Sequence, residues 1–169
     1  MEWVFKVNIR HSVLALLLVP LIACSEQAPL SSLHAQLLRA YPAQDAFQAV
    51  AVDAAHFYSI NNFSIGRHDK ESGELQGGWD GVSAKTGPII HLDSAMVYEG
   101  LLYAAHSNFP QWPMASSIEV WDVQNMQHLR SHSFPDPRGS MTWLDRYDGF
   151  RWGGVGNYDR TSPPRLQSY

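Results

Sequence analysis

The stretch His91–Asn108, HLDSAMVYEGLLYAAHSN, concentrates side chains that could perform chemistry on either side of Glu99-Gly100. A Glu-Gly pair between two alternating runs predicts a β-hairpin with a two-residue turn, because glycine accepts the positive φ that the turn needs. In that register Asp93 faces His106, and His91 faces Asn108. We therefore expect these four side chains on one face of the hairpin, with cross-strand Cβ atoms about 5 Å apart.

Two interpretations of this cluster stay open. In the functional one, two imidazoles and a carboxylate bind a divalent metal, or Asp93 orients His106 as a general base. His91, Asp93 and His106 are then the candidate catalytic and metal-binding residues. In the structural one, Asp–His and His–Asn hydrogen bonds fasten neighbouring parts of the fold.

The hairpin belongs to a unit that occurs three times, in AVAVDAAHFYSINNF, SAMVYEGLLYAAHSNF and TWLDRYDGFRWGGVGNY. Each copy shows a strand, a two-residue turn, a second strand and then an asparagine followed by an aromatic residue. The matching turns are Ala54-Ala55, Glu99-Gly100 and Asp148-Gly149, and the matching aromatic residues are Tyr58, Tyr103 and Trp152. The asparagines Asn62, Asn108 and Asn157 recur, which favours a structural role for Asn108. His91, Asp93 and His106 have no histidine or aspartate counterpart, which keeps them as functional candidates.

A third strand is predicted at SIGRHD and at SIEVWD, followed by shorter fourth strands at SGELQ and QHLRSHSF. The segments RHDKESG and GGWDG are interpreted as polar turns. The unit therefore holds four antiparallel strands in about 45–50 residues, which is the size of a propeller blade. We predict an all-β fold with about three four-stranded propeller-type blades, over residues 45–90, 91–138 and 139–158, the last one incomplete. Residues 159–169 are expected to form an irregular tail.

The sequence resembles extracytoplasmic propellers related to the quinoprotein-dehydrogenase and YVTN-type proteins. The resemblance covers Phe47 to Tyr158 and rests on the recurrent hairpins and on SSIEVWD, which looks like a blade's third strand ending in Trp-Asp. It implies a binding or scaffold module, or alternatively an enzyme of the lactonase or cycloisomerase kind that uses His91, Asp93 and His106 with or without a divalent metal. A β-sandwich with accidental internal similarity is the competing fold.

Three blades are fewer than the four to eight that usually close a propeller ring. Exposed edge strands are prone to aggregation, so we expect further blades to complete the ring. The alternatives are that the chain is the N-terminal part of a longer propeller, that copies self-associate, or that a second polypeptide completes the ring.

The N-terminus is typical of an export signal, with basic residues at Lys6 and Arg10 followed by an apolar run from Val13 to Ala23. Leu21-Ile22-Ala23-Cys24 resembles the bacterial lipobox, which makes residues 1–23 a helical signal peptide and Cys24 the lipidated residue. In that pattern Ser25 implies the periplasmic face of the outer membrane, rather than the inner membrane, as the location of a protein anchored in the membrane through its lipid. A plain secretory signal cleaved near Ala23 is the alternative.

Residues 24–44 are expected to be a tether or to contain a short helix, because Leu33, Leu37 and Leu38 have helical spacing before Pro42. The formal net charge is −4 and there is no long basic run, so we expect no nucleic-acid partner. The expected partners are the membrane and an unidentified protein or small-molecule ligand.

Overall fold

The computed structural model describes residues 34–81, 89–134, 139–158 and 167–168. The signal peptide and Cys24 lie outside these residues, so both remain predictions. The described part is all-β, with three sheets of antiparallel strands. Among the described residues, no helix has the length and hydropathy that crossing a bilayer requires.

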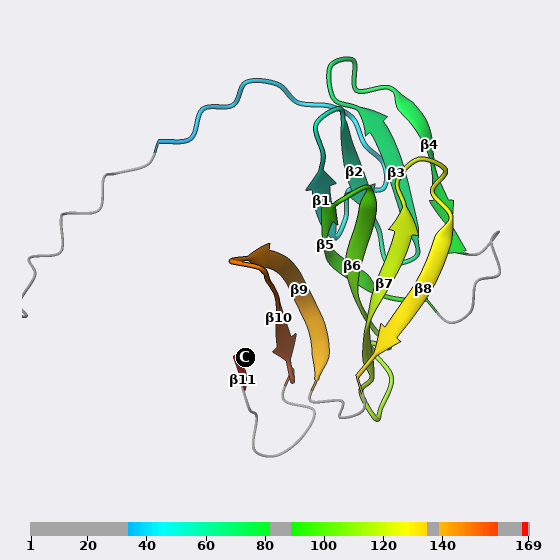
Figure 1. Cartoon of the computed structure of the whole chain (residues 1–169), viewed down its shortest axis with the longest axis vertical. Helices are drawn as coiled ribbons and strands as arrows, with labels where there is room; N and C mark the ends of the chain where they lie inside the picture. The colour runs from blue at the N-terminus through cyan, green and yellow to red at the C-terminus, as the bar shows by residue number, and fades with distance from the viewer. Residues whose placement is uncertain (1–33, 82–88, 135–138, 159–166, 169) are drawn as a thin grey trace, which may run out of the picture. The chain divides into compact units, whose positions relative to one another are not determined.

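The first two sheets have the same strand order as the chain, β1-β2-β3-β4 and β5-β6-β7-β8, and the third has the order β11-β10-β9 (Figure 1). The strands of the first sheet are β1 Ala49–Val52, β2 His56–Ile60, β3 Ser64–Asp69 and β4 Leu75–Asp80. The strands of the second are β5 Leu92–Tyr98, β6 Leu101–Ser107, β7 Ser116–Asp122 and β8 His128–Ser133. Those of the third are β9 Ser140–Tyr147, β10 Phe150–Gly156 and β11 Gln167–Ser168.

The three predicted hairpins form, and next to each turn the register is the expected one. Val52 pairs with Phe57, Tyr98 with Leu101, and Tyr147 with Phe150. In the second and third hairpins both turn residues have positive φ, 50° and 75° at Glu99-Gly100 and 50° and 79° at Asp148-Gly149. Two consecutive positive φ angles give the turn whose twist matches that of the flanking strands, and glycine adopts the second one without a steric penalty.

Three sequence-based predictions need correction. The fourth strand of the first sheet runs from Leu75 to Asp80, not over SGELQ, so most of GGWDG lies in a strand. The carboxylate of Asp69 accepts hydrogen bonds from the backbone N–H groups of Glu71 and Ser72, which holds that segment in the turn. The tail is not wholly irregular, because β11 pairs with β10 and satisfies part of its edge. The alternative of a short helix fails over residues 34–43, which have no regular secondary structure.

The second sheet is apolar on both faces, because successive side chains of a strand point to opposite sides. On β6, Leu102 and Ala104 join the cluster shared with the first sheet, whereas Tyr103 and Ala105 join the cluster shared with the third. The first cluster contains Ala51, Tyr58, Ile60, Ile65 and Trp79 of β1–β4 and Leu92, Leu102, Ala104 and Trp121 of β5–β7. The second contains Tyr103, Ala105, Val120, Met141 and Leu144.

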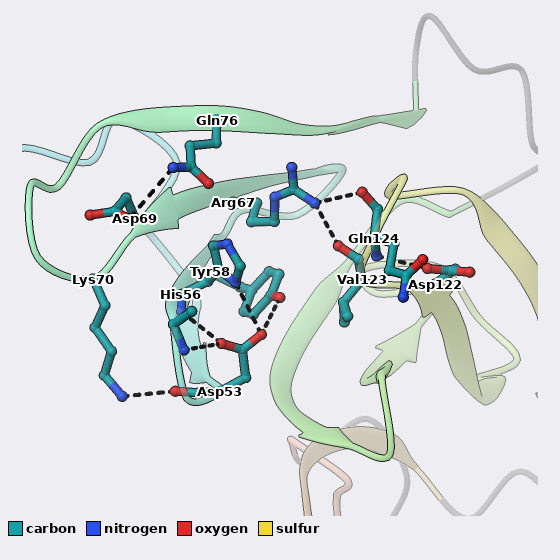
Figure 2. Close-up of polar contacts among 11 residues, drawn as sticks. Asp53, His56, Tyr58, Arg67, Asp69, Lys70, Gln76, Asp122, Val123 and Gln124 are labelled. Carbon is teal, nitrogen blue, oxygen red and sulfur yellow. Dashed lines mark hydrogen bonds and ion pairs between the residues drawn. The ribbon is translucent and has the colours of Figure 1, made fainter.

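A polar contact also joins the first two sheets. The guanidinium Nη1 of Arg67 on β3 donates hydrogen bonds to the backbone carbonyls of Val123 and Gln124, at 2.7 and 2.6 Å (Figure 2). These carbonyls lie in the β7–β8 turn, 56 and 57 residues further along the chain. Hydrogen bonds from a charged donor are stronger than neutral ones, so this contact adds directional specificity to the apolar packing of the two sheets.

We expect Leu102→Ala to lower the free energy of unfolding by about 2–5 kcal/mol, because Leu102 is fully buried between the first two sheets. Leu129→Ala on β8 is the matched control, since Leu129 is exposed, and should cost well under half as much. Chemical denaturation monitored by tryptophan fluorescence measures both. Equal losses in the two variants would contradict the packing described here.

Candidate functional site

The expected register of the β5–β6 hairpin breaks at Asp93. Ala95 pairs with Ala104, but the next pair is Leu92 with His106, so Asp93 and Ser94 together lie opposite Ala105. This is a β-bulge, and it makes the predicted pairing of Asp93 with His106 wrong. The hydroxyl of Ser94 donates to the carbonyl of Leu144 at 3.3 Å and accepts from its N–H at 3.2 Å. The bulged residue is thus bound to the neighbouring strand β9, which the hairpin rule cannot anticipate.

The bulge divides the predicted cluster between the two faces of the sheet. His106 shares its face with its partner Leu92, which is buried in the cluster with the first sheet. His91 and Asp93 flank Leu92 and therefore lie on the other face, toward the third sheet. There His91 Nε2 is 3.6 Å from Asp93 Oδ2. The structure therefore brings His91 and Asp93 together but places His106 elsewhere.

The His91–Asp93 pair lies in an aromatic environment. The His91 ring is 5.0 Å from the Phe109 ring, which in turn is 5.7 Å from the Tyr158 ring. Burial raises the pKa of Asp93, although the nearby His91 opposes the shift, and the buried Oδ2 has no hydrogen-bond partner. Burial also raises the pKa of Tyr158, with a contribution from the charge of Asp93. A carboxyl group in this setting can hold or exchange a proton closer to neutral pH than an ordinary aspartate.

Asn108, the fourth member of the predicted cluster, has a structural role. Its side-chain amide donates to the carbonyl of Pro113 at 2.8 Å, and its Oδ1 accepts from the N–H of Ala115 at 2.8 Å. These two bonds close the loop between β6 and β7. The recurrence of asparagine at this place pointed to structure, and these contacts confirm that interpretation for Asn108.

His106 belongs to a second polar cluster, on the face toward the first sheet. Its Nε2 accepts the N–H of Ile90 at 3.3 Å, so we assign the ring proton to Nδ1, which lies 2.8 Å from Ser117 Oγ. The Ser117 hydroxyl then donates to Glu119 Oε1 at 2.5 Å. These contacts form a continuous hydrogen-bonded chain from Ile90 through His106 and Ser117 to Glu119.

Glu119 is the centre of this cluster, with only 2% of its surface exposed. Its Oε2 accepts from Ser131 Oγ at 2.5 Å and from His128 Nε2 at 2.8 Å. The carboxylate therefore accepts three side-chain hydrogen bonds, which offset the cost of burying it. Sequence analysis missed Glu119, although a lone carboxylate in the middle of the apolar strand SIEVWD was a usable signal.

A cavity of about 310 Å³ opens beside this cluster. Its polar lining includes His106, Ser117, Glu119 and Ser131 of this cluster. The apolar wall includes Ile89, Ile90 and Phe134. The lining combines a few convergent polar groups with a mainly apolar surface, so this cavity is a candidate place for a small ligand.

No known protein family matches this sequence, and no curated protein does. Ser117 lies between the histidine and the carboxylate, whereas in a hydrolytic triad the histidine lies between serine and carboxylate. Within the described residues, no group of three or more His, Cys, Asp or Glu side chains is arranged to hold a metal ion. The Glu119 cluster is thus arranged for hydrogen bonding rather than for nucleophilic attack.

A separate acidic site occupies the β1–β2 turn (Figure 2). Burial alone would raise the pKa of Asp53, but hydrogen bonds from the Tyr58 hydroxyl and from the backbone and ring of His56 outweigh it, and the pKa falls to about 2. Burial and the same hydrogen bond raise the pKa of Tyr58. Asp53 is fully engaged in fixing the turn, so it is a structural residue.

We expect Glu119→Gln to lower the free energy of unfolding by about 1–3 kcal/mol, because the amide nitrogen must replace a carboxylate oxygen that accepts one or two hydrogen bonds. Glu74→Gln, on an exposed side chain, is the control and should change stability by less than about 0.5 kcal/mol. Urea denaturation at pH 7 measures both. A neutral effect at Glu119 would show that its hydrogen bonds do not form in solution.

We expect Asp93→Asn to increase stability at pH 7 by about 1 kcal/mol, because the buried Oδ2 is an unsatisfied carboxylate oxygen. The pKa of Asp93 is higher in the folded protein, so the wild type loses stability as the pH rises through the unfolded and then the folded pKa. The difference between variant and wild type should therefore shrink as the pH falls from the raised folded pKa toward about 4, the pKa of an unfolded aspartate, and stay constant below it. Urea midpoints from pH 3 to pH 8 test this, and an advantage for wild type at pH 7 would contradict it.

Proposed function

We propose that this chain is a lipid-anchored, propeller-type binding or scaffold module of the bacterial cell envelope. The observation that supports this best is the stacking of antiparallel sheets of the same strand order, each covering an apolar face of the one before it. Repeated four-stranded sheets are typical of propeller blades, which act as rigid supports for variable loops. The resemblance in SSIEVWD and the lipobox-like segment ending at Cys24 point in the same direction.

The binding place in this proposal is the cavity beside Glu119. Its polar wall can exchange hydrogen bonds with a small ligand through the hydroxyl groups of its serines, while Ile89, Ile90 and Phe134 cover apolar parts of that ligand. The Glu119 cluster is held by its own internal hydrogen bonds, so the wall is preorganised and its side chains lose little conformational entropy on binding.

An enzyme that uses His91 and Asp93 is the alternative. The observation in its favour is the buried carboxyl of Asp93, with a raised pKa, next to the imidazole of His91. Strongly perturbed carboxyl groups concentrate at functional sites. His106 does not join this pair, so the alternative rests on two of the three predicted residues.

Metal analysis of the purified protein separates the two functions. A binding module should contain the same low, substoichiometric amount of divalent metal in wild type, His91→Ala and His106→Ala. His132→Ala, which removes an exposed histidine of the same sheet, is the matched control. Stoichiometric metal in the wild type that is lost in His91→Ala but kept in His106→Ala and His132→Ala would overturn the proposal in favour of an enzyme that uses His91 and Asp93 with a divalent metal.

Lipid anchoring has its own test. Cells grown with labelled palmitate should incorporate the label into the wild-type protein, and Cys24→Ser should remove it completely, because Cys24 is the chain's single cysteine. Equal labelling of both proteins, or none in the wild type, would show that the segment ending at Cys24 is not a lipidation signal.

A further inference from the structure

The third sheet exposes a cluster of large aromatic side chains. We call the surface formed by Trp143, Tyr147, Phe150 and Trp152 the aromatic face. Tyr147 pairs with Phe150, Trp152 with Asp145, and Gly154 with Trp143, so these residues all lie on one side of the β9–β10 hairpin. Their exposed fractions are 47%, 76%, 66% and 41%.

The size of this surface is that of the largest apolar patch on a typical monomeric protein, which is often functional. With about 200 Å² for each aromatic side chain, the exposed fractions amount to roughly 450 Å² of aromatic surface. Contiguous apolar patches above a few hundred square ångströms mark interaction sites in soluble proteins. We therefore expect the aromatic face to bind a partner with an apolar surface of matching shape.

The repeat identifies what kind of partner fits. Tyr58, Tyr103 and Trp152 occupy the same place relative to the turn in the three hairpins, opposite Ala51, Met96 and Asp145. Tyr58 is 0% exposed because the second sheet covers it, and Tyr103 is 6% exposed because the third sheet covers it. Trp152 is 41% exposed. The first and second sheets each use this side to pack against the sheet that follows. The aromatic face is the corresponding side of the third sheet.

The first sheet has a complementary free surface. Val50 and Val52 of β1 point away from the second sheet and are each 54% exposed; we call them the valine strip. Their counterparts in the second hairpin, Ala95 and Val97, pack against the cluster shared with the first sheet. The second sheet uses this side to pack against the sheet that precedes it. The valine strip is the corresponding side of the first sheet.

The rest of that side of the first sheet already has a cover. The Phe57 ring stacks on His68 at 4.6 Å, and the Tyr41 ring stacks on Phe57 at 5.4 Å. The Tyr41 hydroxyl donates to the carbonyls of Lys70 and Glu71, which holds it there. A partner that approaches this side is therefore directed to β1.

We infer that two copies of this chain associate head to tail, with the aromatic face of one packed on the valine strip of the other. This continues the arrangement within the chain, where the first strand of each sheet contacts the first strand of the next, β1 with β5 and β5 with β9. Packing two aromatic faces against each other would bring together two Asp145 carboxylates, which repel each other. Head-to-tail contacts close into a ring or extend into a filament, depending on the rotation between copies.

Sedimentation velocity of the full chain with Cys24→Ser tests this inference, which rests on the propeller-type stacking proposed above. We expect concentration-dependent association between about 1 and 100 μM, the range of ordinary protein–protein affinity. Phe150→Ser and Val52→Asp should each weaken it at least tenfold, whereas Trp112→Ser, which removes an exposed loop tryptophan, should not change it. Circular dichroism establishes that each variant is folded. A monomer throughout the range, or association that all three variants leave unchanged, overturns the inference.

Disulfide trapping then distinguishes the two packing modes. In the Cys24→Ser background, a Val52→Cys chain mixed with a Tyr147→Cys chain should form a mixed disulfide under mild oxidation, and neither should dimerise alone. A dimer of Tyr147→Cys chains alone would mean that aromatic faces pack together, and it would overturn the head-to-tail arrangement. Both results are independent of metal content and palmitate labelling, so failure of the association leaves the tests of the proposed function intact.

Discussion

Apolar side chains on both faces of a sheet are the constraint on which the rest of this structure depends. A strand alternates its side chains between two faces, so a sheet that is apolar on both needs a neighbour on each. The second sheet has both neighbours, and its faces hold Leu102 and Tyr103 almost completely buried. The first and third sheets each have one such neighbour, and the valine strip and the aromatic face are what remains exposed on their other sides. Core formation and the association that we propose therefore have one physical origin.

A single extra residue in β5 decides how the titratable side chains are distributed. Without the bulge, Asp93 would lie opposite His106, and the hairpin would present a compact histidine–aspartate cluster. With it, Asp93 stays beside His91 on the face toward the third sheet, and His106 joins Ser117 and Glu119 on the other. The bulge is stabilised by the hydrogen bonds between Ser94 and Leu144. Sheet-to-sheet contact thus selects which chemistry the second sheet can offer.

The two polar clusters differ in how well their members are satisfied. Glu119 is buried with three side-chain donors, so removing one partner is costly and the group as a whole gives the second sheet conformational specificity. Asp93 is buried with an oxygen that has no donor, which costs stability. Proteins keep such costs where a function requires them, so Asp93 is the residue at which stability and activity measurements should be compared. The cavity lies beside the satisfied cluster.

The sequence alone determined the paired strands and the turns of the three hairpins and their repetition, because alternation and turn chemistry are local properties of β-hairpins. Tyr58, Tyr103 and Trp152 could be aligned without any knowledge of what covers them. Only the tertiary structure decided the bulge at Asp93, the shift of β4 to Leu75–Asp80 and the pairing of β11 with β10, since each depends on bonds to residues distant in the chain or to the neighbouring turn. It also decided that Glu119 meets His128 and Ser131, because the register shift between Val120 and Trp121 sets which side chains of β8 lie beside those of β7.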